Sequence, residues 1–198
     1  IVDYCNEVEL SSANINSALD SAKTAWQSAM TQWQKAEVMN FGPAKDGGNN
    51  SIRERIYSWP AVSSCFVDGA VVAYNDDAEA FSLANQTPRR TGLDALEHLL
   101  FNDNLNHSCS IDSSTTSETN GAWNSRSDSE RSLARCQYAE LISEDLSNQA
   151  STLLTQWQGG GDNYVQQLTT AGTTSSRYSS ARDALNEISD AMFYIEKE

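Results

Sequence analysis

One segment constrains the fold more than any other, because it keeps a single apolar face for about eight helical turns. It begins after Ser127 and Glu130, which have the spacing of a capping box at a helix N-terminus, and ends at three glycines from Gly159. Its apolar residues recur in steps of three and four: Ala134, Tyr138, Leu141, Ile142, Leu146, Ala150, Leu153, Leu154 and Trp157. A helix of this length needs partners of similar length to bury its stripe, which favours a helical bundle.

Two other segments have the same periodicity. We expect one helix from about Ser11 to Met39, ended by Phe41-Gly42-Pro43, and a last helix from Tyr178 to Ile195. Shorter helices are expected at Ser51–Ser58, Cys65–Tyr74 and Thr91–Phe101. The second of these contains β-branched residues, but no other strand is available to pair with it. The sequence therefore predicts an all-α, up-and-down bundle over residues 1–198, with a long surface loop at Asn102–Arg126.

The charge of the chain excludes some classes of partner. Thirteen Lys and Arg stand against 27 Asp and Glu, for a formal net charge of −14. Such a surface repels phosphate backbones and anionic lipid headgroups, so we expect no nucleic-acid partner. No apolar run approaches the roughly 20 residues that span a bilayer, so we expect no transmembrane segment. No charged stretch followed by an apolar one opens the chain, so we expect any secretion signal to have been removed already.

The four cysteines indicate the compartment. Cys5, Cys65, Cys109 and Cys136 contain no CxxC pair and no zinc-site spacing. They predict two disulfides and an oxidising compartment, the alternative being buried free thiols. Three pairings are open. We favour Cys109–Cys136, because the Ser-, Thr- and Asn-rich segment between them would gain most from being closed.

Candidate chemistry is concentrated in the short helix at Thr91–Phe101. HExxH, GxSxG, P-loop and GxGxxG motifs are absent from the sequence, and neither histidine has a Glu three residues before it. Asp94, Glu97 and His98 share one helix face and are candidate ligands for iron, zinc or calcium. The alternative is structural: Asp94 stabilises the helix N-terminus, and the other two side chains form a solvated face.

Three residues outside this helix are candidates for supporting the site. Arg53 and Arg55 could balance the buried charge of the carboxylates, the alternative being that both are ordinary surface arginines. Trp59, which precedes a proline, is expected to pack in the core rather than to form a ligand platform.

The stretch Gly92–Phe101 resembles the signature helix of imelysin-like proteins, whose motif is GxHxxE. Three further similarities occur in the family's order: Ala25–Gln34 before Phe41-Gly42-Pro43, then Arg55 with Trp59-Pro60, then Arg135–Ala139. The resemblance covers about residues 20–198, and the motif carries over as Gly92, Asp94 and Glu97. The motif histidine is replaced by Asp94, a harder oxygen ligand. His98 occupies a position where the family usually has an aromatic residue.

The resemblance implies an envelope protein, either periplasmic or attached to a membrane by a lipid or at the outer membrane. The family is built from two helical bundles, and a last helix without a stop signal fits a chain that holds the N-terminal bundle. We therefore expect a binding component of iron or other metal-ion uptake, with a metal ion or iron-uptake envelope proteins as partners. The alternatives are a metallopeptidase with Glu97 as general base, and a non-catalytic protein-interaction module.

Overall fold

The structure is a computed structural model that describes residues 1–109, 122–159 and 162–192. These residues contain helices and no strand, which confirms the prediction of an all-α bundle. The α-helices are α1 (Val2–Glu9), α2 (Ile15–Glu37), α3 (Ile52–Ile56), α4 (Ser64–Asp76), α5 (Gly92–Phe101), α7 (Asp128–Trp157), α8 (Tyr164–Thr169) and α9 (Ala181–Met192). Short 3₁₀ turns connect them: η1 (Gly42–Ala44), η2 (Gly48–Asn50), η3 (Leu83–Asn85) and η4 (Pro88–Arg90).

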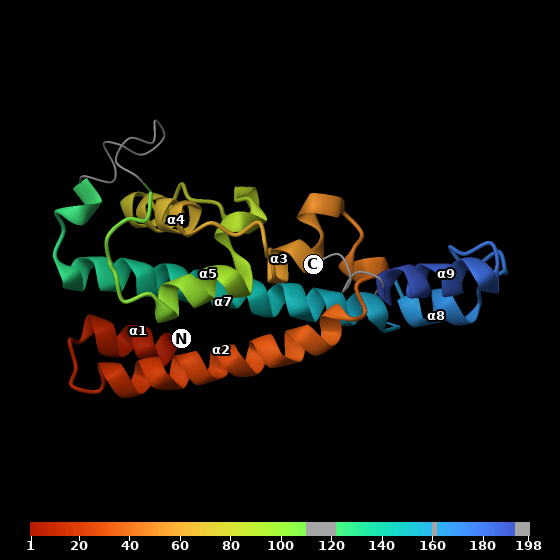
Figure 1. Cartoon of the computed structure of the whole chain (residues 1–198), viewed down its shortest axis with the longest axis horizontal. Helices are drawn as coiled ribbons and strands as arrows, with labels where there is room; N and C mark the ends of the chain where they lie inside the picture. Colours follow the sequence, from red (N-terminus) through yellow and green to blue (C-terminus); the bar gives the residue numbers. More distant parts are fainter. Residues whose placement is uncertain (110–121, 160–161, 193–198) are drawn as a thin grey trace.

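Helix α7 is the axis of the molecule (Figure 1). It contacts α1, α3, α4, α5 and α8. Helices α1 and α2 lie on one side of it and α3 and α4 on the other, whereas α5 overlaps α7 in this view and contacts both α2 and α4 (Figure 1). Helices α8 and α9 lie beyond the C-terminal end of α7 (Figure 1). Among the described residues, no helix is both long enough and apolar enough to cross a membrane.

The largest core cluster lies where α4, α5 and the first half of α7 meet. Its buried members include Val67 and Val71 from α4, Leu96 from α5, and Tyr138 and Ile142 from α7. A second cluster joins α2, α3 and α5 through Met30, Trp33, Ile56 and Leu93. A third holds α8 and α9 against η1 through Phe41, Tyr164, Tyr178, Ala184 and Ala191. The predicted apolar stripes therefore face one another, as a bundle requires.

The capping box of α7 is confirmed, because Ser127 and Glu130 each bond the backbone of the other. The surface loop predicted at Asn102–Arg126 is confirmed over residues 102–109, which form no helix and are mostly exposed or half-buried, but it is wrong around Trp123. Residues 122–124 are helical, and Trp123 is only 1% exposed and donates its indole N–H to the Leu105 carbonyl. A large apolar side chain draws this end of the segment into the core. Residues 110–121 lie outside the described part, as does Ile195, the expected end of the last helix.

The two predicted disulfides are confirmed, but the favoured pairing Cys109–Cys136 is wrong. The bonds join Cys5 to Cys136 and Cys65 to Cys109. Helix α1 packs along α7, which brings the Cα atoms of Cys5 and Cys136 to 5.3 Å. Cys65 lies in the first turn of α4, beside the segment that follows α5. Helix packing selects the pairs, and that packing is not visible in the spacing of the cysteines.

Candidate functional site: the α5 motif helix and the Asp68 centre

Gly92 allows α5 to begin directly against α3. Its φ of +80° lies in the left-handed region that favours glycine. A Cβ atom at this position would lie 2.7 Å from the Ile56 carbonyl oxygen and 2.8 Å from that of Arg55. The motif glycine therefore has a structural role, because it permits the close approach of two backbones.

Asp94, the residue in place of the motif histidine, is buried and bound to protein. Its side chain is 5% exposed, and Oδ2 accepts hydrogen bonds from Ser58 N at 2.7 Å and from Ser58 Oγ at 3.1 Å. Burial raises the pKa of Asp94 to about 6, against the lowering effect of the Ser58 bonds, and the charge of Glu97 adds to the rise. Asp94 thus ties the connection between α3 and α4 to the first turn of α5.

The other two candidate ligands point elsewhere. Glu97 is exposed to solvent, whereas His98 is half-buried and its Nε2 lies 3.0 Å from Asp68 Oδ1. The structure therefore does not bring Asp94, Glu97 and His98 together as one set of ligands. Over residues 1–109, 122–159 and 162–192, no group of three or more His, Cys, Asp or Glu side chains could hold a metal ion. These motif residues do not fit the expected iron, zinc or calcium.

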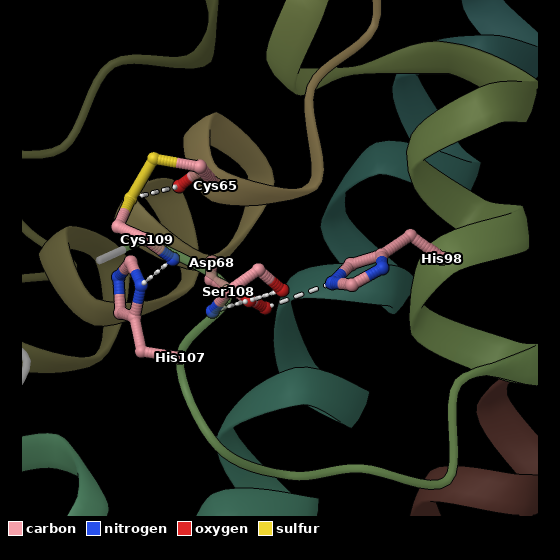
Figure 2. The surroundings of a disulfide bond; sticks show 6 residues. All are labelled: Cys65, Asp68, His98, His107, Ser108 and Cys109. Carbon is pink, nitrogen blue, oxygen red and sulfur yellow. Dashed lines mark hydrogen bonds and ion pairs between the residues drawn. A yellow bond between two sulfur atoms is a disulfide. The ribbon is translucent and has the colours of Figure 1, made fainter.

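Asp68 is the polar centre of the bundle, and the sequence interpretation missed it. It lies on α4 and is 1% exposed. Its Oδ1 accepts a hydrogen bond from Arg135 Nη2 at 3.0 Å and also lies 3.0 Å from His98 Nε2. Its Oδ2 accepts hydrogen bonds from the backbone N of Ser108 at 2.8 Å and from the Ser108 hydroxyl at 2.6 Å. Figure 2 shows Ser108 and His98 joined to the Asp68 carboxylate by dashed lines. An ionised carboxylate has no proton to donate, so His98 donates to it.

These partners keep Asp68 charged. Burial alone would raise the pKa of Asp68, but the hydrogen bonds of His98 and Ser108 and the charge of Arg135 outweigh it and hold the pKa below its usual range. Arg135 is itself 3% exposed and also donates to the Asn102 carbonyl oxygen. The cluster therefore contains a buried ion pair with most of its hydrogen-bonding capacity used.

The Cys65–Cys109 disulfide and Asp68 hold the same stretch of chain. Ser108 precedes Cys109, and Cys65 stands three residues before Asp68, so both attachments join the segment after α5 to α4 (Figure 2). His107 lies beside them and accepts from Cys109 N through Nδ1 at 3.1 Å. Burial lowers the pKa of His107. One signal could have revealed this centre: Asp68 is a lone charge within the apolar run of α4.

The supporting residues proposed from the sequence also have other partners. Arg53 forms ion pairs with Glu37 at 3.0 Å and with Glu54 at 2.7 Å, and its charge lowers the pKa of Asp94. Arg55 donates to the Ala84 carbonyl oxygen at 3.2 Å. The expectation that Trp59 packs in the core is wrong, because its side chain is 42% exposed. Trp59 lies in the connection between α3 and α4.

One comparison with known proteins identifies the family of the chain. The sequence model described as Imelysin, which carries a peptidase-family name, matches residues 7–198. No curated protein and no solved structure is detectably similar to the chain. The match contains the motif helix α5, Asp68 and Arg135, and leaves out only the first six residues. The chain belongs to the imelysin family.

Proposed function

We propose that this chain is a cell-envelope binding component of iron or other metal-ion uptake, and that it acts by contacting a partner. The link with uptake and with the envelope comes from the imelysin family. Two disulfides support an oxidising compartment outside the cytoplasm. We favour a binding partner over a bound ion because of one observation: the polar residues of α5 either make separate structural contacts or are exposed to solvent.

Neither buried carboxylate is well suited to bind a cation. Asp94 prefers its protonated form up to a pH of about 6 and already accepts two hydrogen bonds. Asp68 lies against the Arg135 guanidinium, whose positive charge repels a metal ion. The role of the motif helix is therefore to hold α3, α4 and α5 in place, so that binding takes place at another surface.

Calorimetric titration tests this assignment of the motif helix. The full chain, with its disulfides intact, is titrated with iron, zinc and calcium salts. We expect any heat to be the same in an Asp94→Ala/Glu97→Ala variant as in the wild type. A matched Asp20→Ala/Glu144→Ala variant removes two exposed carboxylates and controls for net charge. Saturable heat that only the Asp94→Ala/Glu97→Ala variant loses would show a metal site on α5 and overturn the proposal.

Uptake itself is measured in the source organism. Deleting the gene should lower the uptake of radioactive iron, and a plasmid carrying the wild-type gene should restore it. A gene that encodes Glu97→Gln should restore uptake equally, because Glu97 is exposed to solvent and the proposal places binding on another surface. Unchanged uptake after deletion would refute the uptake role. Chelator-sensitive peptide cleavage that is lost with Glu97→Gln would instead establish the metallopeptidase alternative.

A further inference from the structure

Helices α2 and α7 flank a groove with a volume of about 520 Å³. Its walls extend over Ala29–Asn40 of the α2 side and Leu146–Trp157 of α7, about 16 Å or three turns of each helix. The residues that shape the walls are mostly apolar or small: Ala29, Trp33, Ala36, Ala150, Leu153 and Trp157. Ile56 of α3 and Leu93 of α5 also line the groove. The walls are thus built on long helices.

The groove continues the space that α1 fills. Helix α1 contacts both α2 and α7, and Figure 1 shows it lying between them near one end of the bundle. The Cys5–Cys136 disulfide fixes it to α7. Ile1 and Leu146 both pack against the largest core cluster, and Leu146 also lines the groove. A helix is therefore an element that already fits between α2 and α7, and the groove lies further along the same two helices.

Some of the apolar side chains along the groove are open to solvent, whereas Trp33, Ile56 and Leu93 are buried. Leu154 is 57% exposed, Met39 is 47% exposed, and Ala29, Ala36 and Ala150 are also exposed. A groove of about 520 Å³ that is lined mainly by apolar side chains is typical of a binding site. Alanines on both walls leave room for another backbone to come close, as small residues do where helices pack tightly.

The charge around the groove selects the partner. The two charged residues that line the groove, Glu37 and Arg53, pair with each other at 3.0 Å, so they add no net charge. Outside the lining, α7 carries Glu140, Glu144 and Asp145 between Cys136 and Trp157 and no Lys, Arg or His. The whole chain has a formal net charge of −14. A partner with basic residues beside its apolar stripe is therefore attracted, and an acidic one is repelled.

We propose that the groove binds a basic amphipathic α-helix of a partner protein, about three turns long, lying end to end with α1. This inference rests on the proposed role as a partner-binding component and names the recognition element of the partner. Affinity comes from the apolar stripe of the helix, and its Lys and Arg residues set the choice of partner.

The test uses fluorescence anisotropy of a labelled peptide of about 14 residues, LKKLLKLLKKLLKL, whose leucines share one helix face. A scrambled peptide of the same composition spreads the leucines around the helix. The protein is the full chain with its disulfides intact. We expect saturable binding of the amphipathic peptide that is at least about tenfold tighter than that of the scrambled one.

Two variants of α7 locate the binding surface. Ala150→Phe fills the groove and should weaken peptide binding by at least about tenfold. Asn148→Phe adds the same side chain about 200° around the helix, on an exposed position outside the groove, and should leave binding unchanged. Circular dichroism verifies that both variants are folded. If Ala150→Phe is not, Ala36→Phe on the opposite wall replaces it.

Several results would overturn the inference. Equal binding of both peptides, or wild-type binding by folded groove variants, would reduce the effect to general attraction between opposite charges. If the groove variants abolish binding of N-phenyl-1-naphthylamine, and the peptide does not displace it, the groove is a small-molecule site. If they abolish a dimer seen by light scattering, the groove takes a second copy. None of these results changes the outcome of the gene-deletion experiment, so the two proposals fail separately.

Discussion

Asp94→Asn should stabilise the protein near neutral pH, because the wild-type carboxylate is buried in a form that it does not favour. The side chain is 5% exposed, and burial raises the pKa of Asp94 from 3.8 to about 6. Asparagine has nearly the same shape and does not ionise. Its Oδ1 can still accept the hydrogen bond from Ser58 N, which now reaches the Asp94 carboxylate at 2.7 Å.

The sign and size of the effect follow from proton linkage. The pKa of Asp94 is higher in the folded chain than in the unfolded one, so the folded state binds more protons between these values and loses stability as pH rises. A rise from 3.8 to about 6 corresponds to about 3 kcal/mol of unfolding free energy. About 2 kcal/mol of this is lost between about pH 4.5 and 7. The stability of Asp94→Asn relative to the wild type should increase by that amount over the same interval.

Urea unfolding, followed by tryptophan fluorescence at about pH 4.5 and about pH 7, measures the difference in unfolding free energy between Asp94→Asn and the wild type. Taking the variant minus the wild type cancels the titration of the other carboxylates. Asp20→Asn, which removes an exposed carboxylate on α2, should give a difference that is nearly independent of pH. A relative stability of Asp94→Asn that stays constant, or that decreases as pH rises, would refute the reasoning.

Three further substitutions test other parts of the structure by urea unfolding. Asp68→Asn should cost about 3–5 kcal/mol, because it leaves the Arg135 guanidinium buried without its carboxylate. Adding Arg135→Met should recover part of the loss, and a cost below about 1 kcal/mol for Asp68→Asn would contradict the ion-pair argument. Gly92→Ala should cost about 2 kcal/mol or more, because its φ is +80° and a Cβ would meet two carbonyl oxygens of α3. A neutral effect would argue against that close approach. Cys65→Ser/Cys109→Ser should cost about 4 kcal/mol for a bond across 44 residues, and retention of full stability would show that the bond constrains little.

The helices were predictable where their signals are local. The capping box at Ser127 and Glu130 fixes the start of α7, and Phe41-Gly42-Pro43 follows the end of α2 closely. Helix α4 was also predicted correctly, although its β-branched residues favour a strand by propensity. Each of these signals acts between residues a few positions apart, and such contacts form in the same way whatever the rest of the fold does.

The site was less predictable, because its contacts join distant parts of the chain. Asp94 bonds Ser58 from 36 positions away, and Asp68 bonds Arg135 from 67 positions away. Helical spacing correctly predicted that Asp94 and Glu97 lie on one helix, but it did not predict how deeply each side chain is buried. The disulfide pairing failed for the same reason, since Cys5 meets Cys136 only through the packing of α1 on α7.

The amino-acid sequence determined the helices, the family and the set of residues that share the face of α5. Tertiary structure decided which of these residues are buried, which carboxylate stays charged and where an apolar surface remains uncovered. A period of 3.6 residues says which side chains point the same way, but it does not say what lies opposite. Burial and ion pairing depend on that opposite surface, so the chemistry of each acidic residue was settled only when the helices packed.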